Sequence, residues 1–549
     1  MAATQANSLT RISSGLQDQR LVAPKGNPDV AQFVKVLRST SRWAAQWRRV
    51  DFDGAVGFGK RVSLTVPPIA ELVNGVMLVV QMPDIYAAQA AAQAAATAEG
   101  TAFLGPQYTW TNSLGHALID TVELEIGGAI VDTLDGRLLE ALDELYEPVD
   151  TLRAKNRMIA RAASGFGPTT WTGSAGAPVT VYVPIPFWFS RPGRMSHALP
   201  ISALYAERVR IHVNLRPVEQ LYYTDARMDP RTVGFRPSVD VSGAMPAIQG
   251  GRFWVAEPTA PGMVYTINAN MLAAGVNGRL LAGYTMPQTL AVDDAYMMLE
   301  YVSVEEPEAV ALRSAELTYF VEQHTAVQVV ASQRTREVRI PLPLTNPTKE
   351  IIWLAQRPDV ATYNAWFLFT RDLGHRSTTT PPVNVPDAYI GPTQVAPSPC
   401  LIPWWPDAVL QPLAENDWRI LPAFRRADSE PVLGALVFYN SYERVEDTTG
   451  SLFRSVLPSL KATKAAVHDR YVYFWPFGEG DALRRGGLEG VYEPRGAANW
   501  DKLPRKEMFL TMANGRDCGT PPDLNIYVWS TGWNVLKVFG GRAGLLFTN

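Results

Sequence analysis

Apolar and polar residues alternate with a period of two in several separate segments of the chain. In KRVSLTV (60–66), TVELEI (121–126), RVRIHVNL (208–215) and LNIYVW (524–529), Val, Leu and Ile occupy every second position. Because successive side chains of a strand point to opposite faces, this pattern predicts strands with one buried face. The pair Gly127-Gly128 directly follows the second segment and predicts a tight hairpin turn. The chain is therefore expected to be mainly β.

One segment has the period of a helix instead. Its apolar residues fall on a single helical face, and the pattern ends before Pro148: Leu138, Leu139, Leu142, Leu145 and Tyr146. Three long segments show neither period. Residues 86–102 are rich in alanine and predict a short helix or a mobile loop, residues 376–408 predict a proline-rich loop, and residues 219–288 form another long connection.

The two halves of the chain resemble each other. VSLTVPP…LVVQMPD (62–84) has the same outline as VRIPLPL…WLAQRPD (338–359). DTLDGRLLEAL (132–142) is similar to EDTTGSLFRSV (446–456), and VPIPFWF (183–189) is loosely similar to VYFWPF (472–477). Each similarity is weak alone, but all three occur in the same order in both halves. A duplicated β domain is the simplest account of this order.

Composition narrows the function classes. A chain of 549 residues is expected to form two or more domains, and its 42 prolines favour strands and loops over helix bundles. The formal net charge of −3 argues against a general nucleic-acid binder, which needs a strong basic surplus. Cys400 and Cys518 are too few for a disulfide framework or a zinc cage. No secretory signal or apolar run long enough to span a membrane is visible.

No catalytic, cofactor-binding or metal-binding constellation emerges. GAVGFGK (54–60) has phosphate-loop spacing, but Arg61 replaces the required Ser or Thr and a strand follows, so a glycine-rich turn is expected. The paired carboxylates Asp143 and Glu144 are expected on the solvated face of their helix. The six histidines lack metal-ligand spacing, and each is expected to be a single residue that is solvated or hydrogen-bonded: His116, His197, His212, His324, His375 and His468.

The fifteen tryptophans leave two interpretations open. They could form stacking platforms for sugars, as in a lectin. Aromatic residues more often fill the core of a sandwich or anchor an interface, and this second interpretation is favoured here.

Several segments together resemble the double jelly-roll major capsid proteins of nucleocytoplasmic large DNA viruses. The resemblance begins at GLQDQRL…GNPDVAQF (15–33) and continues through DFDGAVGFGKRVSLTV (51–66). It includes PIPFWFSRPGRMSHALPISALYAERVRIHVNL (184–215), VRIPLPLTNPTKEIIWLAQ (338–356) and GAANWDKLPRKEMFLTM (496–512). The segments follow the family's order over nearly the whole chain.

The resemblance implies an all-β fold of two tandem eight-stranded antiparallel jelly rolls with long loop insertions and a few short helices. It divides the chain into an N-terminal arm (1–30), a first jelly roll (31–305), a linker (306–318) and a second jelly roll (319–549). The glutamates and proline of VEEPEAVALRSA (304–315) suit a linker.

The implied function is structural and non-enzymatic, without cofactor or metal. Three chains would form a pseudo-hexameric capsomer that tiles the icosahedral shell of a large double-stranded DNA virus. The implied partners are further copies of the chain, minor capsid and penton proteins, and an internal viral membrane that the chain lies near without spanning. No direct contact with nucleic acid is expected. The implied location is the capsid shell of the virion, after assembly in the host cytoplasm.

Two alternatives stay open: a minor capsid or scaffold protein of the same fold, and a carbohydrate-binding β-sandwich or glycoside hydrolase. A further expectation concerns LKVFGGRAGLLFTN (536–549), which would close the second jelly roll. The pair Gly540-Gly541 would allow a bend between two extended pieces. Leu545 and Phe547 would point to one covered face of the last strand, and Leu546 to the other.

Overall fold

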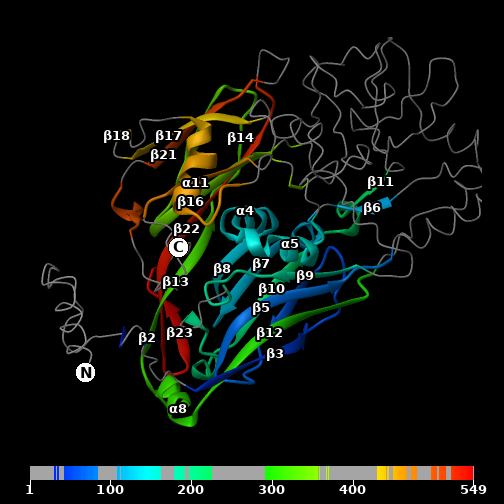
Figure 1. Cartoon of the computed structure of the whole chain (residues 1–549), viewed down its shortest axis with the longest axis vertical. Coiled ribbons are helices and arrows are strands. Elements are labelled where there is room, and N and C mark those ends of the chain that lie inside the picture. Colours follow the sequence, from blue (N-terminus) through cyan, green and yellow to red (C-terminus); the bar gives the residue numbers. More distant parts are fainter. Residues whose placement is uncertain are drawn as a thin grey trace, which may run out of the picture.

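The fold consists of antiparallel sheets with short helices between strands (Figure 1). The structure is a computed structural model. It describes residues 42–84, 108–161, 179–191, 197–224, 291–356, 430–439, 449–466, 471–478, 496–514 and 521–547, apart from 112, 504 and 505 within them, together with 30, 31, 34, 35, 358, 366, 367, 369, 442 and 443. The predicted segments 86–102 and 376–408, most of 219–288, both cysteines and the arm apart from its last residue lie outside the described residues.

Eight strands of the first half form two four-stranded sheets. The strands are β3 (Trp43–Asp51), β4 (Arg61–Thr65), β5 (Leu72–Gln81), β7 (Ile119–Ile126), β8 (Ala129–Asp135), β9 (Thr180–Pro184), β10 (Val209–Leu215) and β12 (Asp294–Val304). One sheet has the order β3-β12-β5-β9 and the other β4-β10-β7-β8. Numbered one to eight along the chain, the orders are 1-8-3-6 and 2-7-4-5, the arrangement of a jelly roll.

The second half repeats this arrangement. Its eight strands are β13 (Leu317–Ala326), β15 (Glu337–Pro341), β16 (Pro347–Gln356), β17 (Val432–Tyr439), β18 (Tyr442–Glu443), β19 (Val472–Pro476), β21 (Lys506–Met512) and β22 (Asn525–Phe539). The sheets β13-β22-β16-β19 and β15-β21-β17-β18 again have the orders 1-8-3-6 and 2-7-4-5. The duplication predicted from the sequence is confirmed, because the described parts of the similar segments lie on strands or helices that occupy the same position in the order of each half.

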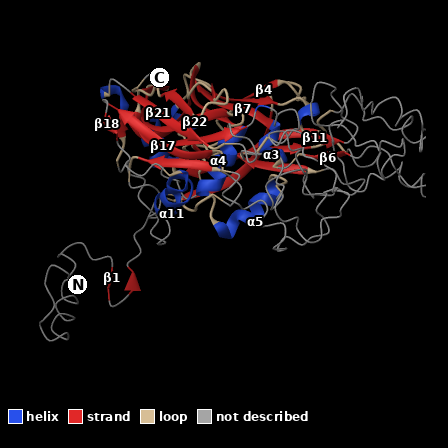
Figure 2. Ribbon diagram, turned by 90° about the horizontal axis from the view of Figure 1, so that it is seen from above, coloured by secondary structure: helices blue, strands red, loops and turns tan. Residues whose placement is uncertain are grey.

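Helices connect the strands or cover their faces, as Figure 2 shows. The α-helices are α3 (Leu114–Leu118), α4 (Gly136–Tyr146), α5 (Val149–Met158), α8 (Glu306–Ser314) and α11 (Leu457–Lys461). The shorter turns are the 3-10 helices η3 (Ile201–Ala203), η4 (Val218–Gln220) and η11 (Trp500–Lys502), and the π-helical η9 (Leu452–Val456) directly before α11.

The remaining strands are short additions to this framework. They are β1 (Val30–Ala31), β2 (Val34–Lys35), β6 (Tyr108–Trp110), β11 (Tyr222–Thr224), β14 (Val330–Ala331), β20 (Ala498–Asn499) and β23 (Arg542–Leu545). Among the described strands, every pairing joins two strands on the same side of α8. Helix α8 occupies the stretch in which the sequence predicts a linker.

The duplication extends to the hydrogen-bonding register. In β5, Gly75 pairs with Glu300 and Val73 with Tyr301, so Asn74 forms a β-bulge. In β16, Glu350 pairs with Thr531 and Thr348 with Gly532, so Lys349 forms the same bulge. A bulge fixes the register of a sheet because it offsets every later pair. Residues at the same distance from the bulge are therefore counterparts in β3-β12-β5-β9 and β13-β22-β16-β19, here called the outer sheets.

The predicted elements form where the sequence places them. The four alternating segments lie in β4, β7, β10 and β22, and the helical pattern forms α4. The side chains of β4 and β7 that point inward are buried: Val62, Leu64, Val122, Leu124 and Ile126. The pair Gly127-Gly128 forms the predicted hairpin turn, with φ of 61° and 89°. Glycine suits this turn because both residues adopt the left-handed region.

Candidate interaction surfaces

Among the described residues, those with candidate chemistry do not assemble into a site, and His375 and His468 lie outside this part of the chain. Gly54 to Lys60 form turns that lead directly into β4. No group of three or more His, Cys, Asp or Glu that could hold a metal ion occurs among the described residues. Two histidines have the hydrogen bonds that the sequence predicts. His116 Nδ1 lies 2.6 Å from Glu140 Oε2, and His212 lies 2.7 Å from both Ser63 Oγ and Glu125 Oε2.

The prediction that Asp143 and Glu144 are solvated is wrong. Glu144 is buried, and Asp143 forms ion pairs with Lys155 at 3.2 Å and with Arg161 at 3.1 Å. Burial by itself would raise the pKa of Asp143, but attraction to Lys155, His116 and Arg161 outweighs it and lowers the pKa well below its usual value. Helix α5 and the segment after it cover the face of α4 that the sequence pattern marks as polar.

The two halves meet along a buried contact, here called the seam. On its first side lie β8 and α4, and on its second side β13, β16 and β22. The backbone N–H of His324 donates to Asp132 Oδ1 at 2.9 Å, and Trp529 Nε1 donates to Asp135 Oδ2 at 3.0 Å. These bonds fix the position of the second half's outer sheet against the first half.

Charged groups also cross the seam. Glu322 of β13 is fully buried and binds Arg191 of the first half at 2.5 Å and Lys349 of β16 at 3.0 Å. Tyr146 at the end of α4 donates a hydrogen bond to the Glu350 carboxylate. Buried charges require such partners because desolvation is costly. The seam is therefore specific in geometry as well as covered from water.

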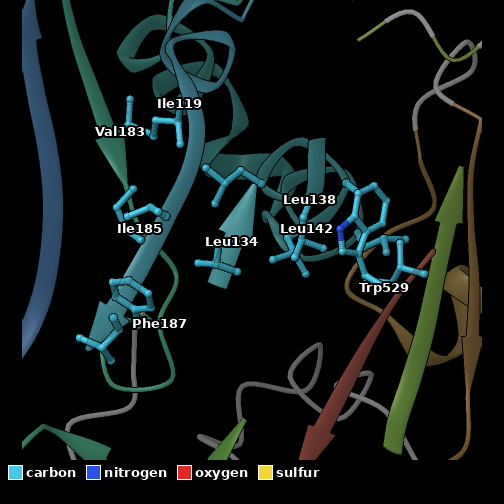
Figure 3. Packing of buried hydrophobic residues seen from close by; sticks show 14 of the residues in the cluster. Ile119, Leu134, Leu138, Leu142, Val183, Ile185, Phe187 and Trp529 are labelled. Atoms are coloured by element: carbon cyan, nitrogen blue, oxygen red, sulfur yellow. The ribbon is translucent and has the colours of Figure 1, made fainter. Parts of the chain in front are cut away.

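Apolar residues of α4 complete the seam. Figure 3 shows Leu138 and Leu142 pointing toward Trp529 of β22. All three side chains are buried. The alternation in 524–529 predicts that Trp529 faces away from the core of its own sheet, and it does. It is nevertheless buried, because the first half covers that face.

Most of the described tryptophans fill cores, which confirms the favoured interpretation. Trp110, Trp188, Trp353 and Trp500 are fully buried. Trp43 and Trp47 differ, because they lie on the edge strand β3 with exposed fractions of 50% and 47%. Edge strands with large exposed apolar side chains are candidates for contact with another chain.

The expectation for the C-terminal segment is partly wrong. The pair Gly540-Gly541 forms a tight hairpin between β22 and β23, with φ of 61° and 82°. However, β23 pairs only with β22 at the sheet edge, and Leu546 and Phe547 are exposed. Hydrogen bonds hold this end instead: Asn534 Nδ2 donates to Phe547 O at 2.8 Å, and Phe547 N donates to Asn534 Oδ1 at 3.0 Å.

Comparisons with known proteins agree with this fold. Residues 31–254 match the family model described as "Major capsid protein N-terminus". Over its full length the chain is similar to the major capsid protein of Phaeocystis pouchetii virus, with 21% identity and 98% of each chain covered. The solved PBCV-1 virus capsid has a chain with a TM-score of 0.60 and 16% identity, covering 94% of this chain and 100% of that one.

These similarities support a relation to the major capsid proteins of nucleocytoplasmic large DNA viruses. Capsid protein 1 of Acanthamoeba polyphaga mimivirus is 28% identical over 220 residues, which are 39% of this chain and 35% of that relative. These relatives are named as capsid proteins, which directs attention to assembly surfaces rather than to an active site. The sequence did not reveal the seam or the exposed face of β3. Alternation marks which positions of a strand share a face, but it carries no signal for what covers that face.

Proposed function

We propose that this chain is the major capsid protein of a large double-stranded DNA virus and that three copies form a pseudo-hexameric capsomer. The observation that carries the proposal is the identical strand order of the two halves, with the same bulge in both outer sheets. Three chains with two equivalent jelly rolls each present six similar units, so a three-fold oligomer can occupy a six-fold position in a shell.

The proposal extends to the organisation of the chain and the virion. The first jelly roll would span 31–305, the linker 306–318 and the second jelly roll 319–549, after an N-terminal arm over 1–30. The capsomers would contact one another, minor capsid proteins and penton proteins, and would surround an internal membrane. Assembly would take place in the host cytoplasm. No described helix is long and apolar enough to cross a membrane.

Light scattering coupled to size exclusion tests the capsomer. The purified full-length chain is expected at three times its mass of 60.4 kDa, and electron microscopy should show particles with a hexagonal outline. A chain that stays monomeric at every concentration would contradict the proposal. A glycan array would then test the carbohydrate-binding alternative.

Copy number separates the major capsid protein from a minor capsid or scaffold protein of the same fold. In virions that contain this chain, its band is expected to be the most intense on a denaturing gel. A faint band, or absence from mature particles, would favour the minor or scaffold role.

A further inference from the structure

The outer sheets of the two halves are equivalent in register but differ in how they are covered. In the second half, one row across the sheet runs from His324 through Thr531 to Glu350, and all three residues are buried. They are buried because the first half covers them in the seam: His324 contacts Asp132, and Glu350 accepts a hydrogen bond from Tyr146.

The counterpart row in the first half has no such cover. It runs from Trp47 through Glu300 to Gly75, at the same distance from the bulge. The Trp47 ring lies across Gly75, and a Cβ built on Gly75 would come within 2.8 Å of Trp47 Cη2. Trp47 nevertheless keeps 47% of its surface exposed. Beside this row, Met298 is partly exposed, whereas its counterpart Trp529 is buried.

The helical segments of the two halves show the opposite difference: the one in the first half is covered, and the one in the second half is exposed. Gly136 and Gly450 open equivalent helical segments, and a Cβ on either would lie within 2.6 Å of an equivalent carbonyl oxygen, that of Ile119 or Val432. Two, six and ten positions after Gly136 lie the seam residues of α4: Leu138, Leu142 and Tyr146. The same positions after Gly450 hold Leu452, Val456 and Leu460.

In this second stripe, across η9 and α11, Leu452 is partly buried against the core, but the other two residues are exposed. Val456 is 46% exposed and Leu460 is 60% exposed. The opposite face of the same segment is buried, with Phe453 and Pro458 against the second half. Figure 1 shows that α11 and β3 lie well apart, so one copy cannot bring these two surfaces together.

We propose that the stripe Leu452–Val456–Leu460 of one copy docks on the Trp47–Gly75 row of β3, β12 and β5 in a second copy. This contact repeats the seam between chains, with Leu460 in the position of Tyr146 and Val456 in that of Leu142. It is heterologous, so successive copies join head to tail, and in the proposed capsomer the third copy closes the ring. The inference deepens the proposed function, because it names the surfaces that hold the capsomer together.

The test uses glutamate substitutions in the full chain. Trp47→Glu, and Val456→Glu combined with Leu460→Glu, each place charge in a contact that would lose water. The dissociation constant of the oligomer is expected to rise at least about thirty-fold, the change that corresponds to loss of one hot-spot residue. Mass is measured by light scattering, and circular dichroism checks that each variant is folded.

Trp43→Glu is the matched control. Trp43 lies on the same face of the same strand, and it is equally exposed. By register its counterpart is Phe320, which stays 46% exposed beside the seam. Trp43→Glu is therefore expected to leave the oligomer intact. If Trp47→Glu behaves like Trp43→Glu while the wild type is a trimer, the inference is wrong and the proposed function stands.

Mixing the two interface variants tests the head-to-tail geometry. The Trp47→Glu chain keeps an intact helical stripe, and the doubly substituted chain keeps an intact sheet row. The mixture is expected to form a dimer of one chain of each kind, which cannot grow further. A mixture that stays monomeric, or that forms trimers, would overturn the inference. A wild type that is monomeric at every concentration would overturn the proposed function itself.

Discussion

The two outer sheets share one architecture but carry different chemistry at matching positions. Around its bulge the second sheet has Lys349 and Glu350, where the first sheet has Asn74 and Gly75. On the edge strand the second sheet has His324, where the first has Trp47. Lys349 and Glu350 face a contact within the chain, whereas their neutral counterparts Asn74 and Gly75 lie beside Glu300 on a face that points outward.

The difference reflects how each contact forms. Within one chain the two halves are tethered, so little entropy is lost when they come together. Buried ion pairs can then fix their relative position. A contact between separate chains must offset the full loss of translational and rotational freedom. Apolar and aromatic surface is the effective source of that free energy. The two halves thus share one geometry, but each half has a surface suited to the part of the assembly that it contacts.

Removal of the central charge of the seam should have the largest effect. Glu322→Ala leaves Arg191 and Lys349 buried without this carboxylate, and the free energy of unfolding is expected to fall by about 3–5 kcal/mol. Denaturant unfolding measures the change. Glu316→Ala is the control, because its pair with Lys537 is exposed on both sides and is expected to contribute less than about 1 kcal/mol. Equal losses in both variants would contradict a charged seam.

A matched pair of truncations compares the two helical stripes directly. Leu142→Ala opens a cavity next to Trp529 and should lower the free energy of unfolding by about 2–5 kcal/mol. Val456→Ala, at the counterpart position, should change the free energy of unfolding of the dissociated chain by no more than about 0.5 kcal/mol, because Val456 is half-exposed. Both are measured at a concentration at which copies are separate. A large loss in Val456→Ala would show that the stripe is already covered within one chain.

Acid should weaken the cluster behind α4. The pKa of Asp143 is lower in the fold than in the unfolded chain, so its stabilisation is present above about pH 4 and is lost as the pH falls further. Asp143→Asn is expected to cost about 1–3 kcal/mol at pH 7. The difference from wild type should shrink below pH 4. The exposed Asp150→Asn is the control, and a difference that stays constant with pH would contradict this account.

The smallest effect is expected at the end of the chain. Phe547→Ala removes a side chain that is 40% exposed, so stability should fall by less than about 1 kcal/mol. Asn534→Ala removes the hydrogen bonds to the Phe547 backbone and should cost about 1–3 kcal/mol. Thermal unfolding of both variants shows which loses more stability. A larger loss in Phe547→Ala would support the original expectation that the final strand is covered.

The sequence predicts what depends on local periodicity. Alternation located β4, β7, β10 and β22, and the order of the internal similarities gave the duplication. Periodicity reports that a face is covered, but not by what. The pattern places Trp529 and Asp143 on open faces because it does not show the separate elements, α4 and α5, that cover them. Phe547 was assigned to a covered face because apolar character does not distinguish a core from an interface.

The position of the eighth strand has a consequence for how the chain folds. In each half it lies inside the outer sheet, between the first and third strands, so Trp43 pairs with Val304 and Leu317 with Val538. Such contacts are far apart in sequence, and folding through them is slow because long loops must close first. Since no described pairing crosses α8, the first half can complete its sheets as soon as Val304 has left the ribosome. During synthesis the second half would then fold against a finished template.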